Sequence, residues 1–212
     1  MARGIKFFLL LMIAAATSRA GEKNVDFSHL SNDLSDQQKT GIVLPVVNEK
    51  YEYYEVCGRC EKDIQCELQQ KCIKQNDGKK YDSVTNWKVK WDYGYSHTPQ
   101  TCRADSFTVT VEIVYHLPKW VRTGDAPRPL VEKWDSYLEK LMTHEKGHRD
   151  KAVEAATELI RSVADLPAAR TCAELDRAVH DLSRERMAKL LEEQQKYDAA
   201  TNHGAAQGAV FP

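Results

Sequence analysis

The sequence predicts an α+β fold in which a small antiparallel sheet packs on two long antiparallel helices. Two segments in the middle of the chain alternate apolar and polar residues, as half-buried strands do, and two later segments repeat apolar residues with helical spacing. A short loop at Leu166-Pro167 separates the two helical segments, and helices joined so closely pack in opposite directions. The 212-residue length fits one domain with a single core.

The first 20 residues have the pattern of a secretory signal peptide. Arg3 and Lys6 lie at the start, and the apolar run Phe7–Ala16 is too short to span a bilayer. Ser18 and Ala20 place small residues at the −3 and −1 positions of a cleavage site. We therefore expect a periplasmic or secreted protein that makes no stable membrane insertion once this peptide is removed.

Residues 21–50 are rich in Ser, Asp, Asn and Gln, and we expect them to form a polar, partly disordered leader. Their apolar patch, Ile42–Val47, fits only the edge of a sheet, because Pro45 lacks a backbone donor. The folded domain is predicted over residues 51–212. A net charge of −1 without a basic run argues against a nucleic-acid partner. The expected partner is a peptide or protein substrate, and we expect a monomer.

Three strands are predicted in this domain. The first, Tyr51–Val56, is rich in aromatic residues. Val84–Tyr95 and Phe107–His116 alternate most clearly, and we expect them to pair antiparallel through a loop around Pro99. The last of these strands is expected to end at Leu117-Pro118.

Two long helices follow the strands. The first is expected to begin near Pro129, since proline suits the first helical turn, and to end near Asp165, before Leu166-Pro167. The second is expected to begin at Thr171, which forms a T-x-x-E capping box with Glu174. Both helices have an apolar stripe on one side and charged residues on the other, so each should bury one face.

Six cysteines in an exported chain most simply form three disulfides. Cys102 and Cys172 are each isolated in the sequence, so we expect them to pair with each other. The other four cysteines would pair among themselves in an order that the spacing does not determine: Cys57, Cys60, Cys66 and Cys72. The single C-x-x-C is only weak support for a zinc ribbon or a redox site, because neither a second C-x-x-C nor a βαβ unit accompanies it.

The first helix carries the motif H-E-x-x-H at His144, Glu145 and His148. Histidines four residues apart lie on one face of a helix, about one turn from each other, and can bind one Zn²⁺ together. Glu145 can reach a water at the metal and act as the general base of a metallopeptidase. Both histidines continue the inward stripe of Leu141 and Ala152. The alternative interpretation is a pair of hydrogen-bonded core histidines without a metal.

Gly147 lies inside the same motif. A glycine in a helix interior costs about 1 kcal/mol relative to alanine. We infer from this cost that another part of the protein packs close against the helix backbone at Gly147.

A catalytic zinc usually has three protein ligands, so one more ligand is needed. His203 is the first candidate, because the second helix ends there and returns antiparallel to the first helix. The longer motif H-E-x-x-H-x-x-G-x-x-H is excluded, since Lys151 and Glu154 occupy its glycine and third histidine positions. Other candidates stay open, among them two carboxylates of the second helix and the remaining histidines: Glu174, Glu185, His29, His97, His116 and His180.

Four segments together carry a resemblance to a known family. They are Tyr53-Tyr54-Glu55-Val56-x-Gly58, Leu117-Pro118-x-Trp120, the helix from Trp134 through His144-Glu145-x-Gly147-His148 to Ala152, and the tail from Tyr197-Asp198 through His203-Gly204-x-x-Gln207-Gly208-Ala209. With these segments the chain resembles a bacterial family of predicted secreted zinc-dependent proteases, catalogued as a domain of unknown function. The resemblance implies an exported bacterial protein with a zincin-like metal site, and it supports His203 as a ligand. The cluster Cys57–Cys72 is not part of the resemblance.

The favoured function is zinc-dependent hydrolysis of peptide bonds, with Zn²⁺ held by His144, His148 and His203. Glu145 would take a proton from water and pass it to the leaving amine. Tyr197 is a possible donor to the oxyanion, or simply a tyrosine that completes the stripe of the second helix. Two alternatives remain open, a non-catalytic exported zinc-binding or regulatory protein and a zinc amidase acting on cell-wall peptides.

Overall fold

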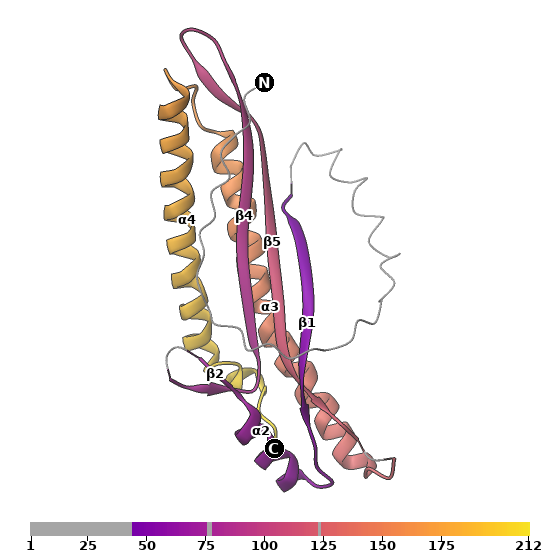
Figure 1. The fold of residues 1–212 in the computed structure, drawn as a ribbon. Helices are drawn as coiled ribbons and strands as arrows, with labels where there is room; N and C mark the ends of the chain where they lie inside the picture. The colour runs from indigo at the N-terminus through magenta and orange to yellow at the C-terminus, as the bar shows by residue number, and fades with distance from the viewer. Residues whose placement is uncertain (1–43, 76–77, 123) are drawn as a thin grey trace.

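The computed structural model describes residues 44–75, 78–122 and 124–212 (Figure 1). The predicted signal peptide and the predicted leader up to residue 43 lie outside this part. The described elements are β1 (Val46–Val56), α2 (Glu61–Lys71), β2 (Ile73–Lys74), β3 (Lys80–Tyr81), β4 (Val84–His97), β5 (Cys102–Trp120), α3 (Arg128–Ala164), α4 (Cys172–Thr201) and the 3₁₀ turn η1 (Ala205–Gln207). Within these residues no helix has the length and apolar character needed to cross a bilayer.

The main sheet has three strands in the order β1-β5-β4, and β2 pairs with β3 in a separate small sheet. β4 and β5 pair antiparallel, as predicted, from Val84 opposite His116 to His97 opposite Cys102. β1 pairs parallel to β5, so the prediction of an antiparallel sheet is wrong for this strand. A parallel partner requires a long crossover connection, and the chain from α2 to β4 supplies it.

Four strand ends differ from the prediction. β4 continues past Tyr95 to His97, and β5 begins at Cys102 instead of Phe107. β1 begins at Val46, so the last residues of the predicted leader belong to the sheet. β5 continues through Pro118 to Trp120 instead of ending at Leu117-Pro118. β4 begins only opposite His116, so no residue of β4 needs the N–H that Pro118 lacks.

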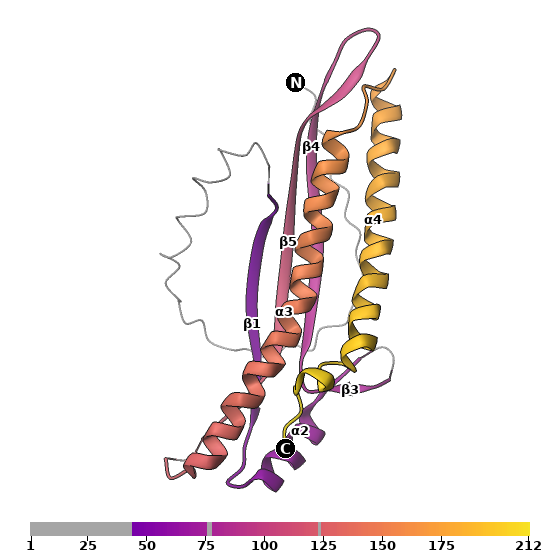
Figure 2. The same ribbon diagram turned by 180° about the vertical axis from the view of Figure 1, so that it is seen from behind.

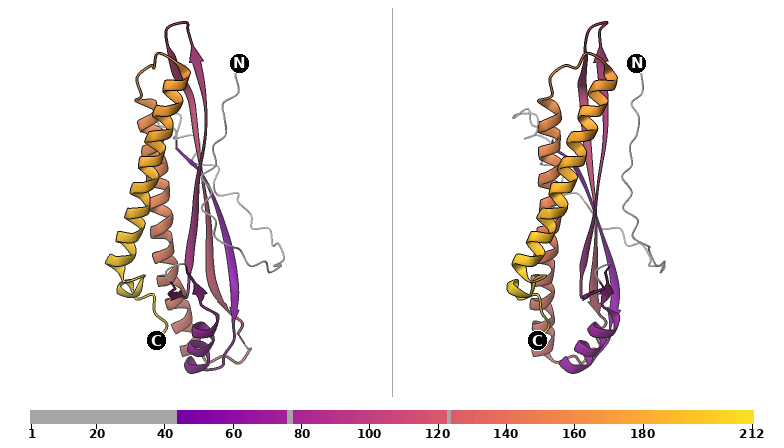
Figure 3. Two further views of the ribbon diagram at one scale, coloured as in Figure 1. Left: turned by 60° about the vertical axis from the view of Figure 1, so that its left-hand side comes forward. Right: turned by 90° about the vertical axis from the view of Figure 1, so that its left-hand side faces the viewer.

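Helices α3 and α4 lie on the same face of the sheet (Figure 3). α3 spans almost the predicted range, and α4 has the predicted cap at Thr171. The hydroxyl of Thr171 accepts from the backbone N–H of Glu174 at 3.2 Å, and the Glu174 carboxylate accepts from the N–H of Thr171 at 3.2 Å. This reciprocal pair fixes the point at which the chain turns back along α3.

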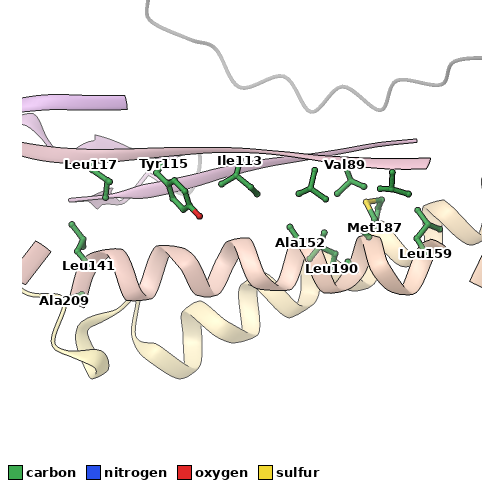
Figure 4. Packing of buried hydrophobic residues seen from close by; sticks show 14 of the residues in the cluster. Val89, Ile113, Tyr115, Leu117, Leu141, Ala152, Leu159, Met187, Leu190 and Ala209 are labelled. Atoms are coloured by element: carbon green, nitrogen blue, oxygen red, sulfur yellow. The ribbon is translucent and has the colours of Figure 1, made fainter. Parts of the chain in front are cut away.

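The core lies between this face of the sheet and the two helices (Figure 4). Alternate residues of β5, such as Ile113 and Tyr115, point at α3, as the period of a strand requires. Ala152 and Ala155 of α3 are fully buried, and their small side chains allow the helix to lie close to its neighbours. The stripe predicted for α3 is therefore its buried face.

The predicted disulfide between Cys102 and Cys172 is present. It joins the start of β5 to the start of α4, and Cys102 also forms an isolated bridge with Ala169. The prediction that the other four cysteines pair among themselves is wrong, because the thiols of Cys57, Cys60, Cys66 and Cys72 are free. These cysteines lie on or beside α2, a helix that the sequence analysis did not predict.

Candidate metal centre

Three possible metal ligands come together between α3 and the C-terminal end of α4. His144 and His148 are one turn apart on α3, and Asp198 lies one turn before the end of α4. One donor atom from each residue lies within 4.8 Å of the other two. Figure 2 shows the two helices approaching this region with η1 and the tail beside them.

Two glutamines determine which nitrogen of each imidazole faces this group. Nδ1 of His144 lies 3.0 Å from Oε1 of Gln207, and Nδ1 of His148 lies 2.5 Å from Oε1 of Gln194. The amide orientation is supported on the other side, since Nε2 of Gln194 donates to the carbonyl of His148 and Nε2 of Gln207 to Tyr197. An amide oxygen only accepts, so each Nδ1 carries the hydrogen.

The two Nε2 atoms then present lone pairs to a carboxylate. Oδ1 of Asp198 lies 3.0 Å from Nε2 of His148 and 3.4 Å from Nε2 of His144. Three electron-rich atoms at this separation repel one another unless a cation or a proton lies among them. Two imidazoles and one carboxylate are a common ligand set for Zn²⁺, with the other ring N–H groups held by acceptors. The residues present therefore fit a zinc ion.

The electrostatics agree with a shared positive charge. Burial lowers the pKa of His148, but its hydrogen bonds to Asp198 and Gln194 outweigh burial, so the pKa is raised above its usual value. Burial raises the pKa of Asp198, but its hydrogen bonds with both imidazoles and the charge of His148 hold this pKa well below its usual range. A proton and a metal ion would thus compete for the same three atoms.

Glu145 is buried on the side of α3 that faces the sheet, with only 2% of its surface exposed. Oε1 accepts a hydrogen bond from the hydroxyl of Ser83, and Oε2 accepts one from the hydroxyl of Thr85 at 2.5 Å. Ser83 directly precedes β4 and Thr85 is its second residue, so the start of this strand positions the carboxylate. Each carboxylate oxygen keeps a further lone pair that can accept a hydrogen bond from a water.

The ring of Tyr197 lies against the motif. A Cβ atom at Gly147 would overlap the Tyr197 hydroxyl and lie 2.8 Å from its Cε1, which confirms the predicted close approach. The ring stacks on His144 with a centroid distance of 5.1 Å, and the hydroxyl donates to the His144 carbonyl at 3.2 Å. These contacts make Tyr197 a support for the imidazole, and its possible role as an oxyanion donor stays a prediction.

His203, the predicted third ligand, lies beside the donor group and not within it. Its Nδ1 is 3.5 Å from Oδ1 of Asp198, and its ring contacts Tyr81 at a centroid distance of 4.9 Å. His203 and the preceding Asn202 both have the left-handed conformation, with φ of 50° and 49°. The chain thus turns sharply at the site, and the structure brings Asp198 into the place predicted for His203.

The other ligand candidates lie elsewhere. Glu174 caps the far end of α4, and His116 interacts with Asn86 and Glu52 on the sheet. His29 lies outside the described residues.

Sequence reasoning gave no role to five residues that shape the site, although the family tail motif contained the last two: Ser83, Thr85, Gln194, Asp198 and Gln207. One signal was present for two of them. Continuing the stripe of α4 from Leu190 in steps of four reaches Gln194, which is buried, and then Asp198. Polar residues at such inward positions indicate a buried polar site.

No curated protein and no solved structure matches the chain. A family model described as "Bacterial protein of unknown function (DUF922)" matches residues 51–204, a segment that contains the H-E-x-x-H motif, Gln194 and Asp198. This match covers more than half of the chain. The chain therefore belongs to the DUF922 family of bacterial proteins of unknown function.

Proposed function

We propose that this protein is an exported zinc-dependent peptidase. The observation that carries the proposal is the convergence of Nε2 of His144, Nε2 of His148 and Oδ1 of Asp198, next to a buried glutamate of the same H-E-x-x-H motif. Three protein ligands leave one coordination position for water or substrate, which is the arrangement of catalytic zinc sites. His203, whose Nδ1 lies 3.5 Å from Oδ1 of Asp198, is the second choice for the third ligand.

Zn²⁺ bound at these residues would polarise a substrate carbonyl and lower the pKa of a water toward about 7. Glu145 would accept a proton from the attacking water and donate it to the nitrogen of the leaving amine, so that one water and one peptide bond yield a carboxylate and an amine. Ser83 and Thr85 hold the Glu145 carboxylate, and two glutamines hold the imidazoles. This support lets the site keep its geometry during the reaction.

A second candidate is a non-catalytic protein that keeps zinc for structure or regulation. The burial of the motif favours it, since His144 is 4% exposed, Glu145 is 2% exposed, and both oxygens of Glu145 already accept hydrogen bonds. A site closed to substrate would bind the metal without turnover. The same burial also suits a peptidase whose site opens when substrate binds.

Replacement of Glu145 by Gln separates these two functions. The peptidase should retain its zinc in Glu145→Gln and lose hydrolysis of a mixed peptide library by at least about 100-fold, in line with the loss of a general base. Glu139→Gln, an exposed change six residues earlier on α3, is the matched control and should keep full activity. Zinc binding without hydrolysis in the wild type would favour the non-catalytic protein.

Analysis of the products would separate a peptidase from a zinc amidase. The same assays are run on proteins and on cell-wall peptides. Cleavage confined to the cell-wall peptides would assign the site to an amidase.

A further inference from the structure

β1 forms a free edge of the main sheet. Within the described residues it pairs only with β5, and Figure 1 shows it at the side of the sheet away from β4. The strand has 11 residues, so a long row of backbone N–H and C=O groups faces away from β5. An unpaired edge of this kind is a template for another strand.

Exposed apolar side chains gather on the same strand. Of the seven large hydrophobic residues that are exposed in the described part of the chain, four lie between Leu44 and Tyr53. Tyr51 is 43% exposed and Tyr53 is 54% exposed. Val46 points to one face of the sheet and Tyr51 and Tyr53 point to the other, so both sides of this edge expose apolar surface. Exposed apolar surface is typical of a site that binds another protein.

The pairing with β5 shows which backbone groups are free. The C=O of Val56 accepts from the N–H of Val121, which directly follows β5, at 2.9 Å. Val56 therefore directs its backbone groups to β5. The groups alternate along a strand, so even-numbered residues of β1 face β5 and odd-numbered residues, with Tyr51 at the centre, face the free edge.

We propose that β1 pairs antiparallel with β1 of a second copy of this chain, about a two-fold axis at Tyr51. The free groups of Tyr51 and the partner's Tyr51 would then bond to each other, and the two sheets would join into one of six strands. Lys50 would lie opposite the partner's Glu52, and Glu52 opposite the partner's Lys50. These side chains share one face of the sheet. Nζ of Lys50 lies 2.7 Å from Oε1 of Glu52 in its own chain, so in the dimer each charge would lie between an opposite charge of its own chain and one of the partner.

The charges also select this register over its neighbours. Moving the axis by one residue toward the N-terminus places Lys50 opposite the partner's Lys50. Moving it by one residue the other way places Glu52 opposite the partner's Glu52. Like charges directly opposite each other destabilise a strand pair. Charged residues usually protect an edge from pairing, but here their order makes the strand complementary to itself.

This inference concerns a surface away from the candidate metal centre and does not depend on the proposed function. It differs from the expectation of a monomer in the sequence analysis. A single strand pair buries less than the roughly 800 Å² per partner of a standard interface. We therefore expect a monomer–dimer equilibrium that depends on protein concentration.

Sedimentation velocity of the purified full chain, over about a hundredfold concentration range, tests the proposal. The variants Lys50→Glu and Glu52→Lys each place like charges opposite each other, and each should raise the dissociation constant at least about tenfold. The double exchange Lys50→Glu/Glu52→Lys restores both opposite-charge pairs and should return the constant to within about threefold of wild type. Lys62→Glu, an exposed charge reversal on α2, is the matched control and should leave the dissociation constant of the dimer unchanged.

Two results would overturn the proposal. One is a wild-type chain that stays monomeric at every concentration. The edge of β1 would then be covered by another segment of the same chain or would stay unpaired. The other is a dimer that the single variants do not weaken, or that the double exchange does not restore. Thermal melts of all variants show whether a weaker dimer reflects a damaged fold.

Discussion

Nδ1 of His144 lies 3.0 Å from Oε1 of Gln207, so a residue of the tail, 63 positions later, holds an imidazole of the long helix. The tail is itself anchored, because Phe211 packs against Trp134 and Tyr137 of the same helix. Through Gln207, the tail that follows α4 therefore takes part in the candidate metal centre. This relationship leads to the first prediction.

Gln207→Met should weaken zinc binding about 10- to 100-fold, since it removes the acceptor that orients His144 while keeping a similar volume. Gln207→Glu keeps an acceptor oxygen for Nδ1 of His144. This variant should bind zinc with an affinity near that of the wild type. Competition titration with a zinc chelator measures both. Equal affinities for the two variants would show that the oxygen of Gln207 does not matter.

Gly147→Ala should destabilise the protein, although the same change in an ordinary helix interior stabilises by about 1 kcal/mol. The added Cβ would overlap the hydroxyl of Tyr197, and such overpacking costs about 1–3 kcal/mol. Urea unfolding measures the free energy of unfolding in both proteins. An increase in stability would contradict the close approach of Tyr197.

Replacing both Cys102 and Cys172 by Ala should lower the free energy of unfolding by about 2–4 kcal/mol, because the bridge closes a separation of 70 residues. The bridge lies at the start of α4, whereas Asp198 lies near its end, so zinc content should not change. Unfolding and metal analysis of the same sample test both statements. Loss of zinc in the variant without the bridge would mean that the position of the whole of α4 depends on the disulfide.

Asp82 should make stability depend on pH. Burial raises the pKa of this carboxyl above its usual value, although the hydroxyl of Tyr137, 2.8 Å from Oδ2, acts in the opposite direction. In the unfolded chain Asp82 ionises near pH 3.9. Its folded form holds the proton to a higher pH, so stability is greatest below the unfolded pKa and falls as pH rises through the folded one.

Asp82→Asn removes this titration and keeps an oxygen that Tyr137 can donate to. The variant should match the wild type near pH 3 and be the more stable protein at pH 7. Urea unfolding of both proteins across this range measures the difference. A difference that does not change with pH would contradict the raised pKa of Asp82.

The sequence predicted the parts of the fold that depend on local patterns. The stripe through Leu141 and Ala152 placed the two histidines of α3 on its buried face, and Thr171 with Glu174 marked the start of α4. The isolated positions of Cys102 and Cys172 predicted their bridge. Each of these features is decided by spacing along the chain or by a single pair of residues.

The remaining features depend on contacts between distant segments. The parallel pairing of β1 with β5 is not encoded in the alternation of either strand. α2 buries only Ile64 and Leu68, too few apolar residues to give a helical stripe. Asp198 faces the histidines because it continues the inward stripe of α4, whereas His203 follows the end of the helix in a left-handed turn.

The central claim is that His144, His148 and Asp198 together hold a zinc ion. The most direct test is the zinc content and zinc affinity of the purified wild type, Asp198→Ala and His203→Ala, measured in parallel. We predict one zinc per chain in the wild type, its loss or a large drop in affinity in Asp198→Ala, and its retention in His203→Ala. Zinc that survives in Asp198→Ala but is lost in His203→Ala, or a wild type that binds no zinc after reconstitution, would contradict the account.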